Sequence, residues 1–589
     1  MKIYILSLLI QVLALVNGFS SGFELRRERI LKFYIDSVQL GRDKIDFFVL
    51  TAKIKFGKDL EKYLHALDSL ILNPGVGDMF FAYQLIGLYM HCKEVLPTSY
   101  RDKIKNVFKR RTIYRGDTEN HWLMYYIAWY LISQEWKGET WSNLKTSEEN
   151  FHESEEYINF WIDKTTSSGQ MEFDSPTYII AFVPPLCVLY DFAQDTLMKK
   201  KAQMMLEYIL VDYAVEYLKG CYCGAHSRDY PDLTVKPLEV QAQALGYLYF
   251  GETDFNPKAK EKSTVIFCAM SNFKPPEIIY HIATDRSIPY EHRERKRVRN
   301  VIRFGKERNP VVYKYTYMTS RYCIGSLQGG ILQPIQQHSW DITFEGGGTV
   351  FSVHPYFSEI ELGMFFPEEV KILPELVDRA HKVYRSPDKL SSSSPYERIF
   401  QYKGTLIALY NLNDMKEEEK YRHVNIFVSG LVASFKVDSS GWIYGRFGDA
   451  FFGLRIIGGF SEMLKDSAGY RFKVYGDKIC LIVETGDIDE FGSFENFTSS
   501  LKATLSDFRV EDFSVIYKSL HGFEMFFSYD GKRFIDGKKF EMDWGLFEGR
   551  FIGSRDNGKV VEMIYMEPSG KIIKRILDFN KFEIFDELK

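Results

Sequence analysis

The fold is decided by the stretch 121–136, which reads HWLMYYIAWYLISQEW. Its apolar residues recur at spacings of three and four, the period of a helix with a buried face. The same period returns, between short polar breaks, in the stretches 25–38, 48–72, 79–95, 157–162, 179–192, 198–218 and 238–249. Successive helices of this kind favour stacked helical hairpins that close into a ring or run open as a solenoid.

Beyond Arg286 the pattern changes to alternation. The run 311–318 reads VVYKYTYM, and 424–437 alternates in the same way, with glycine-rich turns at 329–330 and 346–348. Alternation between turns predicts antiparallel strands in stacked sheets. We therefore expect a signal peptide over 1–18, an (α/α) toroid of helical hairpins over 23–285 and an antiparallel β-sandwich over 286–589.

Composition excludes several classes of protein. Hydrophobic residues make up 45% of the 589 residues and charged residues 26%, which is ordinary for a globular chain and excludes disorder. The net charge of -4 excludes the global positive field of a nucleic-acid binder. One basic run, HRERKRVR at 292–299, could contact an acidic polymer, but we interpret it as a solvated charged face. Aromatic residues reach 16%, and their rings offer flat faces to sugars as readily as they fill a core.

The first residues resemble a secretory signal. Lys2 precedes an apolar run over 3–16, and small residues follow at Gly18 and at 20–22. We expect a secreted or periplasmic protein, and no later apolar run is long enough to span a membrane. The spacing of Cys221 and Cys223 is too tight for the usual zinc pair, so we interpret both as packing residues.

Three short polar clusters interrupt the helical pattern: Asn120-His121, the segment EFDSPTY at 172–178, and HSRDY at 226–230. Together they supply an amide, imidazoles, a guanidinium and two phenols. Such groups can hold a carboxylate and move a proton beside it. We expect their three loops to meet in one cleft and handle an acidic sugar, with Trp122 as an aromatic platform.

Each cluster also has a plain structural interpretation. Asn120 is a favoured helix N-cap residue, and His121 then lies in the first turn. Glu172 and Asp174 are ordinary loop carboxylates in that interpretation, and Tyr178 is a helix residue of the core. The run 226–230 then serves only as a polar connection, although it carries more chemistry than a connection needs.

In the β half, His338 is the histidine most suited to reach back to the cleft, because it lies close to Trp340 after a turn region. A core or edge position is the competing interpretation. The other histidines lack metal-ligand spacing, and the chain has no phosphate loop, nucleotide fingerprint or nucleophile elbow. We expect no cofactor, and the sequence does not indicate a structural divalent metal, although the fold leaves one possible.

These motifs carry a resemblance. The run ENH at 119–121 before a helix rich in Tyr and Trp, SPTY at 175–178, and QQH at 336–338 before Trp340 resemble the heparinase II/III and alginate-lyase superfamily of polysaccharide lyases. The resemblance implies a toroid of helix pairs joined to an antiparallel β-sandwich. It also implies eliminative cleavage of a uronic-acid-containing polysaccharide without a cofactor. By that resemblance Asn120 neutralises the uronate, His121 assists or is the base, and Tyr178 donates or accepts the proton.

The chemistry of the residues is compatible with elimination. The carboxylate charge must be quenched before the adjacent carbon loses its proton, and Asn120 or Arg228 can do this. The base is then Tyr178 or Tyr230 with a pKa lowered by neighbouring positive charge, or neutral His121 or His226. One tyrosine can play both parts, because a phenol can also protonate the leaving oxygen. Arg228, His226, Glu172, Trp122 and His338 are expected to contact the substrate.

Two alternatives remain open. A glycoside hydrolase on a helical toroid would use Glu172, Asp174 and Asp229 as its acid and base, and would add water instead of forming a double bond. A carbohydrate-binding protein without catalysis would use the same aromatic residues as platforms. No nucleic acid and no membrane span are expected, and the partner is an acidic polysaccharide.

Overall fold

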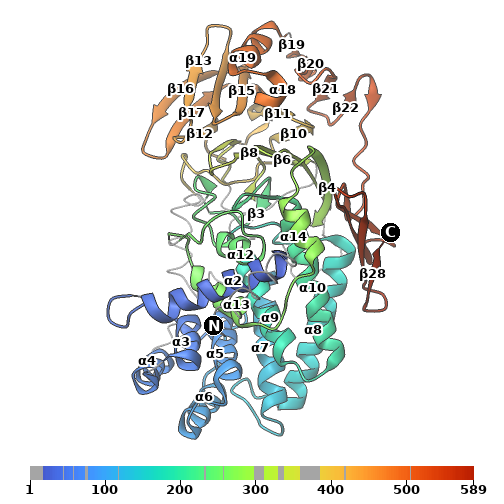
Figure 1. Cartoon of the computed structure of the whole chain (residues 1–589). Helices are drawn as coiled ribbons and strands as arrows, with labels where there is room; N and C mark the ends of the chain where they lie inside the picture. The colour runs from blue at the N-terminus through green and yellow to red at the C-terminus, as the bar shows by residue number, and fades with distance from the viewer. Residues whose placement is uncertain are drawn as a thin grey trace, which may run out of the picture.

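The computed structural model describes residues 18–588 apart from 44, 58, 73–76, 117, 231–233, 257, 298–310, 329–336, 358–384, 417–418 and 505. Helices make up the N-terminal half and antiparallel strands the C-terminal half (Figure 1). This confirms the predicted fold class. The last helix of the first half ends at Thr284, and the first long strand begins at Tyr290. The signal peptide prediction falls on residues 1–17, which lie outside the described residues, and on Gly18, where the first described helix begins.

The helices and helical turns of the first half follow one another closely. They are α2 (Gly18–Lys32), η1 (Phe33–Ser37), α3 (Phe47–Phe56), α4 (Leu60–Leu72), α5 (Met79–Cys92), α6 (Thr98–Arg110), α7 (Glu119–Glu135), α8 (Ser147–Ser168), η2 (Ile179–Ala181), α9 (Val183–Phe192), α10 (Thr196–Val215), α12 (Ala242–Tyr249), η3 (Lys262–Thr264), α13 (Val265–Met270) and α14 (Glu277–Thr284).

Neighbouring helices form hairpins. Helices α3 and α4, α7 and α8, and α9 and α10 contact each other, and α5 lies between α3 and α7. The first helix of the described residues, α2, contacts α12, α13 and α14, so the two ends of the described helical region meet. Phe23 of α2 stacks on Tyr249 of α12 with 6.0 Å between ring centroids, which fixes this closure.

Three differences from the predicted helices have local causes. The stretch 48–72 is broken at Gly57, where a side chain would stand 2.2 Å from the carbonyl oxygen of Lys53. Helix α6 was not predicted, because it buries only Ile104 and Phe108 and its remaining residues are polar or half-buried. The stretch 198–218 leaves the helix after Val215 and continues into a short hairpin.

The strands begin inside the helical half with three short pairs of residues: β1 (Tyr217–Leu218), β2 (Cys221–Tyr222) and β3 (His226–Ser227). The C-terminal half contains β4 (Tyr290–Arg297), β5 (Val311–Met318), β6 (Tyr322–Gln328), β7 (Gln337–His338), β8 (Trp340–Phe344), β9 (Thr349–Val353), β10 (Glu397–Tyr402), β11 (Thr405–Asn411), the turn η4 (Leu412–Asp414), β12 (Val424–Ser429), β13 (Ser434–Val437), β14 (Trp442–Phe447), β15 (Ala450–Ile457), β16 (Phe460–Lys465), β17 (Gly469–Tyr475), β18 (Lys478–Asp487), α18 (Ile488–Phe491), α19 (Phe494–Ala503), β19 (Ser506–Arg509), β20 (Ser514–Lys518), β21 (Glu524–Ser528), β22 (Arg533–Ile535), β23 (Lys538–Lys539), β24 (Phe547–Gly549), β25 (Ile552–Arg555), β26 (Val560–Met566), β27 (Ile572–Asp578) and β28 (Glu583–Leu588).

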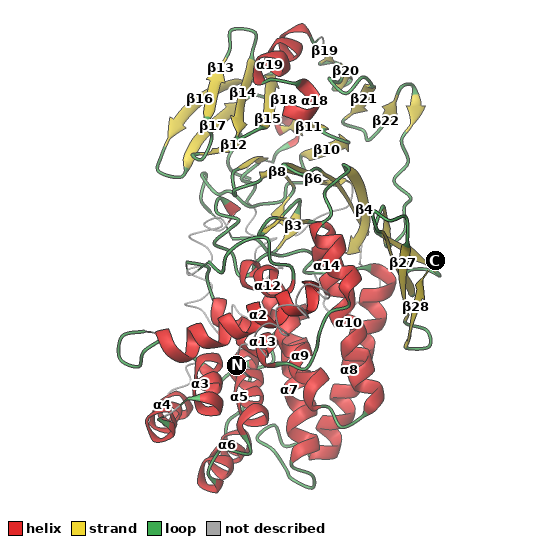
Figure 2. Ribbon diagram, viewed as in Figure 1, coloured by secondary structure: helices red, strands yellow, loops and turns green. Residues whose placement is uncertain are grey.

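These strands form a sandwich of stacked sheets (Figure 2). In the described residues the large sheet has the order β16-β17-β12-β9-β8-β6-β5-β4-β24-β25-β26-β27-β28, and a second sheet has the order β10-β11-β18-β15-β14-β13. Ile342 of the first sheet and Leu406 of the second belong to one buried cluster. On the other face of the second sheet, Ile407 packs with Val515 of the small sheet β19 to β23. Neighbouring residues such as Leu406 and Ile407 thus bury opposite faces.

The C-terminal strands of the large sheet leave the sandwich and cover the helices. Leu577 and Phe579 belong to the same buried cluster as the helical core, and Phe579 contacts the ring of Tyr208 in α10. The guanidinium of Arg575 donates two hydrogen bonds, of 2.6 and 2.8 Å, to buried Glu207. The two halves of the chain are therefore bound to each other by core packing and by charge.

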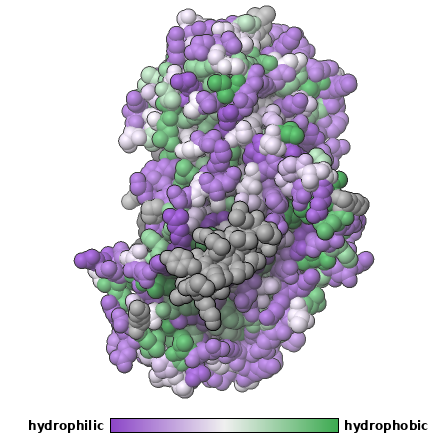
Figure 3. Space-filling view, viewed as in Figure 1, coloured by the Kyte–Doolittle hydropathy of each residue, from purple (hydrophilic) through white to green (hydrophobic). Residues whose placement is uncertain are grey.

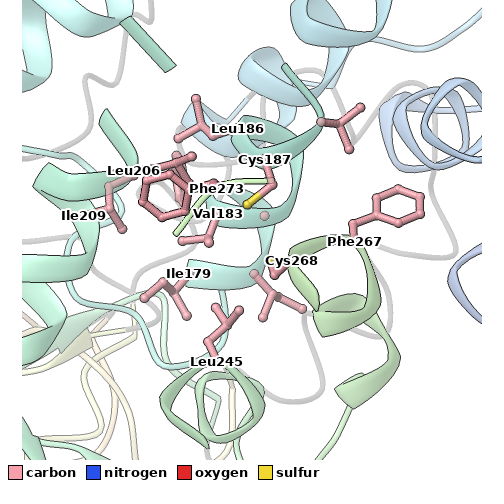
Figure 4. Packing of buried hydrophobic residues seen from close by; sticks show 14 of the residues in the cluster. Ile179, Val183, Leu186, Cys187, Leu206, Ile209, Leu245, Phe267, Cys268 and Phe273 are labelled. Atoms are coloured by element: carbon pink, nitrogen blue, oxygen red, sulfur yellow. The ribbon is translucent and has the colours of Figure 1, made fainter. Parts of the chain in front are cut away.

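The core behind α9 supports the segment discussed below. Ile179, Val183 and Cys187 project into it beside Cys268 (Figure 4). All seven cysteines are buried free thiols, so the interpretation of Cys221 and Cys223 as packing residues is confirmed. The face seen in Figure 3 carries hydrophilic and hydrophobic residues interspersed. Across the described residues, no helix combines the length and apolar character needed to traverse a lipid bilayer.

Candidate functional site

The segment 172–178 follows α8 without forming a regular helix. Gly169 ends α8, and Asp174 adopts a left-handed backbone conformation with φ of 50°. The hydroxyl of Ser175 accepts a hydrogen bond from the amide of Tyr178 at 3.0 Å and donates one to the carbonyl of Arg228 at 3.1 Å. This serine therefore joins the second polar cluster of the sequence to the third.

The loop 226–230 is also held in an unusual conformation. Arg228 has a φ of 57°, and its neighbour Asp229 accepts a hydrogen bond from the amide of Tyr230 at 2.9 Å. A left-handed conformation costs free energy for a residue with a long side chain, and such positions gather at functional sites. Asp174 and Arg228 are thus two left-handed residues on the two segments that meet.

Three side chains meet where these segments touch. The hydroxyl oxygens of Tyr178 and Tyr230 are 2.7 Å apart, and their rings are stacked with 6.1 Å between centroids. Arg228 donates a 2.8 Å hydrogen bond to the hydroxyl of Tyr178, and its guanidinium lies 4.6 Å from the centre of that ring. Both tyrosines are half-buried, whereas Arg228 is 5% exposed.

Burial raises the pKa of Tyr178 well above its ordinary value, and the Arg228 charge opposes this shift without cancelling it. At neutral pH Tyr178 is therefore a phenol and not a phenolate. Its resting chemistry is that of a proton donor, and Arg228 is placed to stabilise the negative charge left when the proton departs.

Glu172 connects this trio to the first polar cluster. Its carboxylate forms an ion pair with Nε of Arg228 at 3.0 Å and accepts hydrogen bonds from both the backbone amide, at 2.8 Å, and the side-chain amide of Asn120. Asn120 is fully buried, and Thr118 is the N-cap residue of α7. Asn120 therefore holds Glu172 and does not itself reach the surface.

A second carboxylate, Glu119, fixes the backbone of the same segment. It accepts hydrogen bonds from the amides of Met171 and Glu172, each at 2.9 Å. Arg297 of β4 donates a 2.7 Å hydrogen bond to its other oxygen. The sequence predicted no site role for Glu119 beyond its place in the ENH motif and in a helix start, since a buried carboxylate in a first turn has the same local signature as an exposed one.

Below the trio lies a wholly buried ion cluster. Lys314 of β5 contacts Asp174 at 2.8 Å, Glu294 at 3.5 Å and Glu216. Lys296 of β4 contacts Asp174 at 3.0 Å, and also Asp212 and Glu294. Tyr222 donates a 3.1 Å hydrogen bond to Asp174. The cluster joins helical residues to the large sheet.

The ion cluster corrects the interpretation of the run 292–299 as a solvated face. His292, Glu294 and Lys296 are at most 1% exposed. They alternate along β4, so that one face of the strand turns toward the helices. The two-residue period was present in the sequence and was the signal that could have found this face. Residues 298 and 299 lie outside the described residues.

The remaining predicted residues are divided between two places. His226 of β3 and His338 of β7 are paired across a short two-stranded sheet, and their rings stack with 5.4 Å between centroids. Both are buried, and burial lowers the pKa of His226 well below its ordinary value. His338 therefore does reach the helical half, beside the loop that carries Arg228.

His121 and Trp122 are half-buried and point away from Asn120, because successive residues of a helix are turned by about 100°. The ring of His121 contacts Phe80 with 5.5 Å between centroids. The guanidinium of Arg115 lies 3.8 Å from the centre of the Trp122 ring. The structure thus brings together Asn120, Glu172, Tyr178, Arg228 and Tyr230, and places His121 and Trp122 on another side of α7.

Comparisons with known proteins add little to this geometry. No protein-family model matches the chain, and a search of curated proteins finds no relative. Among solved structures, the chain is similar to a chondroitin AC lyase of Streptomyces coelicolor A3, in complex with chondroitin sulphate. That match covers 95% of this chain and 85% of the other, with a TM-score of 0.39 and 8% sequence identity. A likeness of this size carries no argument about activity.

Proposed function

We propose that the chain is a polysaccharide lyase that cleaves a uronic-acid-containing polysaccharide by β-elimination. The single observation that carries the proposal is the hydrogen-bonded trio of Tyr178, Tyr230 and Arg228. Two phenols in contact beside a buried guanidinium can remove and supply a proton next to a carboxylate. The proposal includes export, for which the N-terminal sequence is the support.

The two phenols can act as one relay. The oxygen of Tyr230 takes the proton from the carbon next to the uronate carboxylate while its own proton moves to the oxygen of Tyr178. Tyr178 gives its proton to the leaving glycosidic oxygen, and the carbon-oxygen bond breaks as the carbon-carbon double bond forms. Neither tyrosine ends with a net charge, so the raised pKa of Tyr178 is compatible with the step.

The charge of the uronate is countered by Arg228 in this proposal. Glu172 fixes the guanidinium through its Nε, and Asn120 fixes Glu172, so Asn120 is a positioning residue. This differs from the role that the family resemblance implies, in which the amide itself contacts the uronate. Burial of Asn120 is the reason for the change.

The carboxylates required by the hydrolase alternative are not arranged for hydrolysis. Glu172 is paired with Arg228, Asp174 with Lys296 and Lys314, and Asp229 accepts hydrogen bonds from Tyr230 and Thr234. All three are at most 3% exposed. An acid and base pair must face the glycosidic bond and a water molecule from opposite sides.

A polymer screen tests the proposal. Alginate, glucuronan, heparan, hyaluronan and pectic polymers are each incubated with the purified chain, and the absorbance of unsaturated uronates is followed. We expect signal with at least one polymer and near-complete loss in Tyr178→Phe and in Asn120→Ala. The matched control is Tyr190→Phe, which removes a hydroxyl from a half-buried tyrosine that packs on Phe273.

Three outcomes contradict the proposal. New reducing ends without the absorbance of a double bond would indicate a hydrolase. Saturable binding of a polymer without turnover, unchanged by Tyr178→Phe, would indicate a carbohydrate-binding protein. Full activity in folded Tyr178→Phe and Asn120→Ala variants would leave the trio without a catalytic role.

A further inference from the structure

Two cysteines, one from each half of the chain, lie against each other. Cys223 follows β2 in the helical half, and Cys323 belongs to β6 of the large sheet. Their thiols are within hydrogen-bonding reach of each other. Both residues are wholly buried in the core that the two halves share, and both are free thiols in this structure. Two thiols thus face each other across the main internal boundary of the molecule.

The backbone of the two segments sets this contact. A side chain on Gly325 of β6 would stand 2.6 Å from Cα of Gly224 and 3.2 Å from the backbone nitrogen of Ala225. Alternate residues of a strand lie on the same face, so Cys323 lies on the face of β6 that the segment 223–225 covers. A glycine in a strand permits so close an approach of another backbone. The two thiols are therefore held together by the packing of two chain segments, and not by side-chain orientation alone.

We propose that Cys223 and Cys323 form a disulfide bond when the chain folds in an oxidising compartment. The proposal rests on the export that is part of the proposed function, because the cytosol keeps most thiols reduced. The bond would join the large sheet to the segment that leads into the loop 226–230, which carries Arg228 and Tyr230. A cross-link between positions so far apart in the sequence strongly restricts the unfolded chain.

The bond forms by exchange with a disulfide oxidant, such as oxidised glutathione or an exported oxidoreductase. The thiolate of one cysteine attacks the oxidant, forms a mixed disulfide and releases the first thiol of the oxidant. The thiolate of the other cysteine then attacks the sulfur of its partner, and the second thiol of the oxidant departs. The two cysteines lose two protons and two electrons in total, and the oxidant gains both.

The exchange must take place before the two thiols are fully enclosed. Burial raises the pKa of Cys223 to about 11, although the contact with Cys323 opposes the shift. Burial also raises the pKa of Cys323 well above its ordinary value. The thiolate is the reactive form, so the folded, reduced chain should exchange slowly. We expect the bond to form during folding and to be shielded afterwards.

A second pair of thiols does not support the same proposal. Cys187 and Cys268 also lie close together, in the core behind α9 (Figure 4). The hydroxyl of Tyr249 lies 3.7 Å from the sulfur of Cys187 and bonds to both thiols. A disulfide there would leave this buried hydroxyl without its thiol partners, which opposes the bond.

Oxidative refolding tests the proposal. The reduced chain is unfolded in urea, refolded with oxidised and reduced glutathione, alkylated with iodoacetamide and digested without reductant. We expect mass spectrometry to find a peptide that joins Cys223 to Cys323 in most molecules, and dithiothreitol should abolish it. Cys323→Ser should also abolish it. The matched control Cys480→Ser should keep it, because the buried cluster of Cys480 contains no other cysteine among its described residues.

A second measurement uses the unaltered chain and does not depend on the folding of variants. Urea denaturation compares the oxidised, refolded chain with the same chain after reduction. The oxidised chain should unfold at a higher urea concentration, because the cross-link restricts its unfolded state.

Three outcomes overturn the proposal. Cys223 and Cys323 could both be alkylated after oxidative refolding, Cys223 could pair with Cys221 instead, or reduction could leave the urea midpoint where it was. A cross-linked chain that cleaves no polymer would contradict the proposed function only. An active chain whose thiols stay free would contradict the disulfide only.

Discussion

Two polar clusters share one short segment of the chain and differ in almost every other respect. Glu172 belongs to the cluster of Arg228, Tyr178 and Tyr230, which ends at two half-buried phenols. Asp174, two residues later, belongs to the ion cluster of Lys296 and Lys314, which is wholly buried. Under the proposed function the first cluster carries out the chemistry and ends at the half-buried phenols, whereas the second, wholly buried cluster holds the segment in place.

The largest loss of stability is expected from a substitution in the buried ion cluster. Lys314→Met removes one of the two ammonium groups that contact Asp174 and also the contacts of Lys314 with Glu216 and Glu294, and breaking a buried ion cluster costs about 3–5 kcal/mol. Chemical denaturation measures the loss. The control is Lys389→Met, since Lys389 is as buried but donates to a carbonyl, and burial lowers its pKa to about 7. Equal losses in both variants would show that burial of a lysine, and not the carboxylates, sets the cost.

Substitutions in the cluster of Glu172, Arg228, Tyr178 and Tyr230 should lower the reaction rate more than the stability. Arg228→Lys keeps the charge but cannot reach both Glu172 and Tyr178, because a lysine lacks the planar fork. We expect kcat to fall by about 10²–10³-fold, with a change in KM that is much smaller. Arg575→Lys, which weakens the paired hydrogen bonds to Glu207, serves as the control and should leave kcat unchanged.

Removal of one tyrosine hydroxyl from each cluster compares the two clusters directly. Tyr230→Phe removes the proposed relay partner of Tyr178 and should lower kcat about 10²-fold while thermal stability stays the same. Tyr222→Phe removes the hydrogen bond to Asp174 and should cost about 1 kcal/mol of stability at unchanged kcat. If the two variants behaved alike, the division between chemistry and support would not hold.

The last expected effect is a dependence of stability on pH. Burial raises the pKa of Glu216 to about 8, although Lys314 opposes the shift. The folded state therefore holds a proton that the unfolded state has lost between pH 4.5 and about 8, and stability falls as the pH rises through that window. The slope reaches at most about 1.4 kcal/mol per pH unit for one proton. Denaturation curves of Glu216→Gln should show a shallower slope there.

Glu294→Gln is the matched control for that slope. Burial acts to raise the pKa of Glu294, but Lys296 and Lys314 outweigh it and hold the pKa well below its ordinary value. Its contribution to stability is present above pH 4.5 and is lost as the pH falls. Its replacement should keep a falling slope above pH 5 that ends at a lower pH, because the Glu294 charge helps to raise the pKa of Glu216. Loss of the slope in this variant would contradict the assignment to Glu216.

The local spacing of apolar residues was sufficient to predict most of the helices and strands. The alternation of 311–318 predicted a strand that the structure has at Val311–Met318, and the 3.6-residue period located most of the helices. Helix α6 was not predicted, because only two of its residues, Ile104 and Phe108, are buried. Where the apolar residues of a segment recur at a clear period, the sequence alone identifies the segment as a helix or a strand.

Long-range pairing explains what the sequence could not predict. Lys314 and Asp174 are separated by 140 positions, and nothing in either local run indicates the other. The half-buried phenols of Tyr178 and Tyr230 could be proposed from residue type, but the burial of Asn120 could not. The side-chain amide of Asn120 binds the carboxylate of Glu172, which lies 52 positions away in the sequence. The sequence near Asn120 does not indicate this contact.

The packing of β26 and β27 on the helices has a consequence for synthesis. Tyr208 is fully buried, and part of its cover is Phe579, near the end of the chain. A ribosome makes α10 before β26 and β27, so this helix must keep an apolar surface open until those strands have been made. Removal of the two strands should then destabilise α10, although that helix was synthesised earlier.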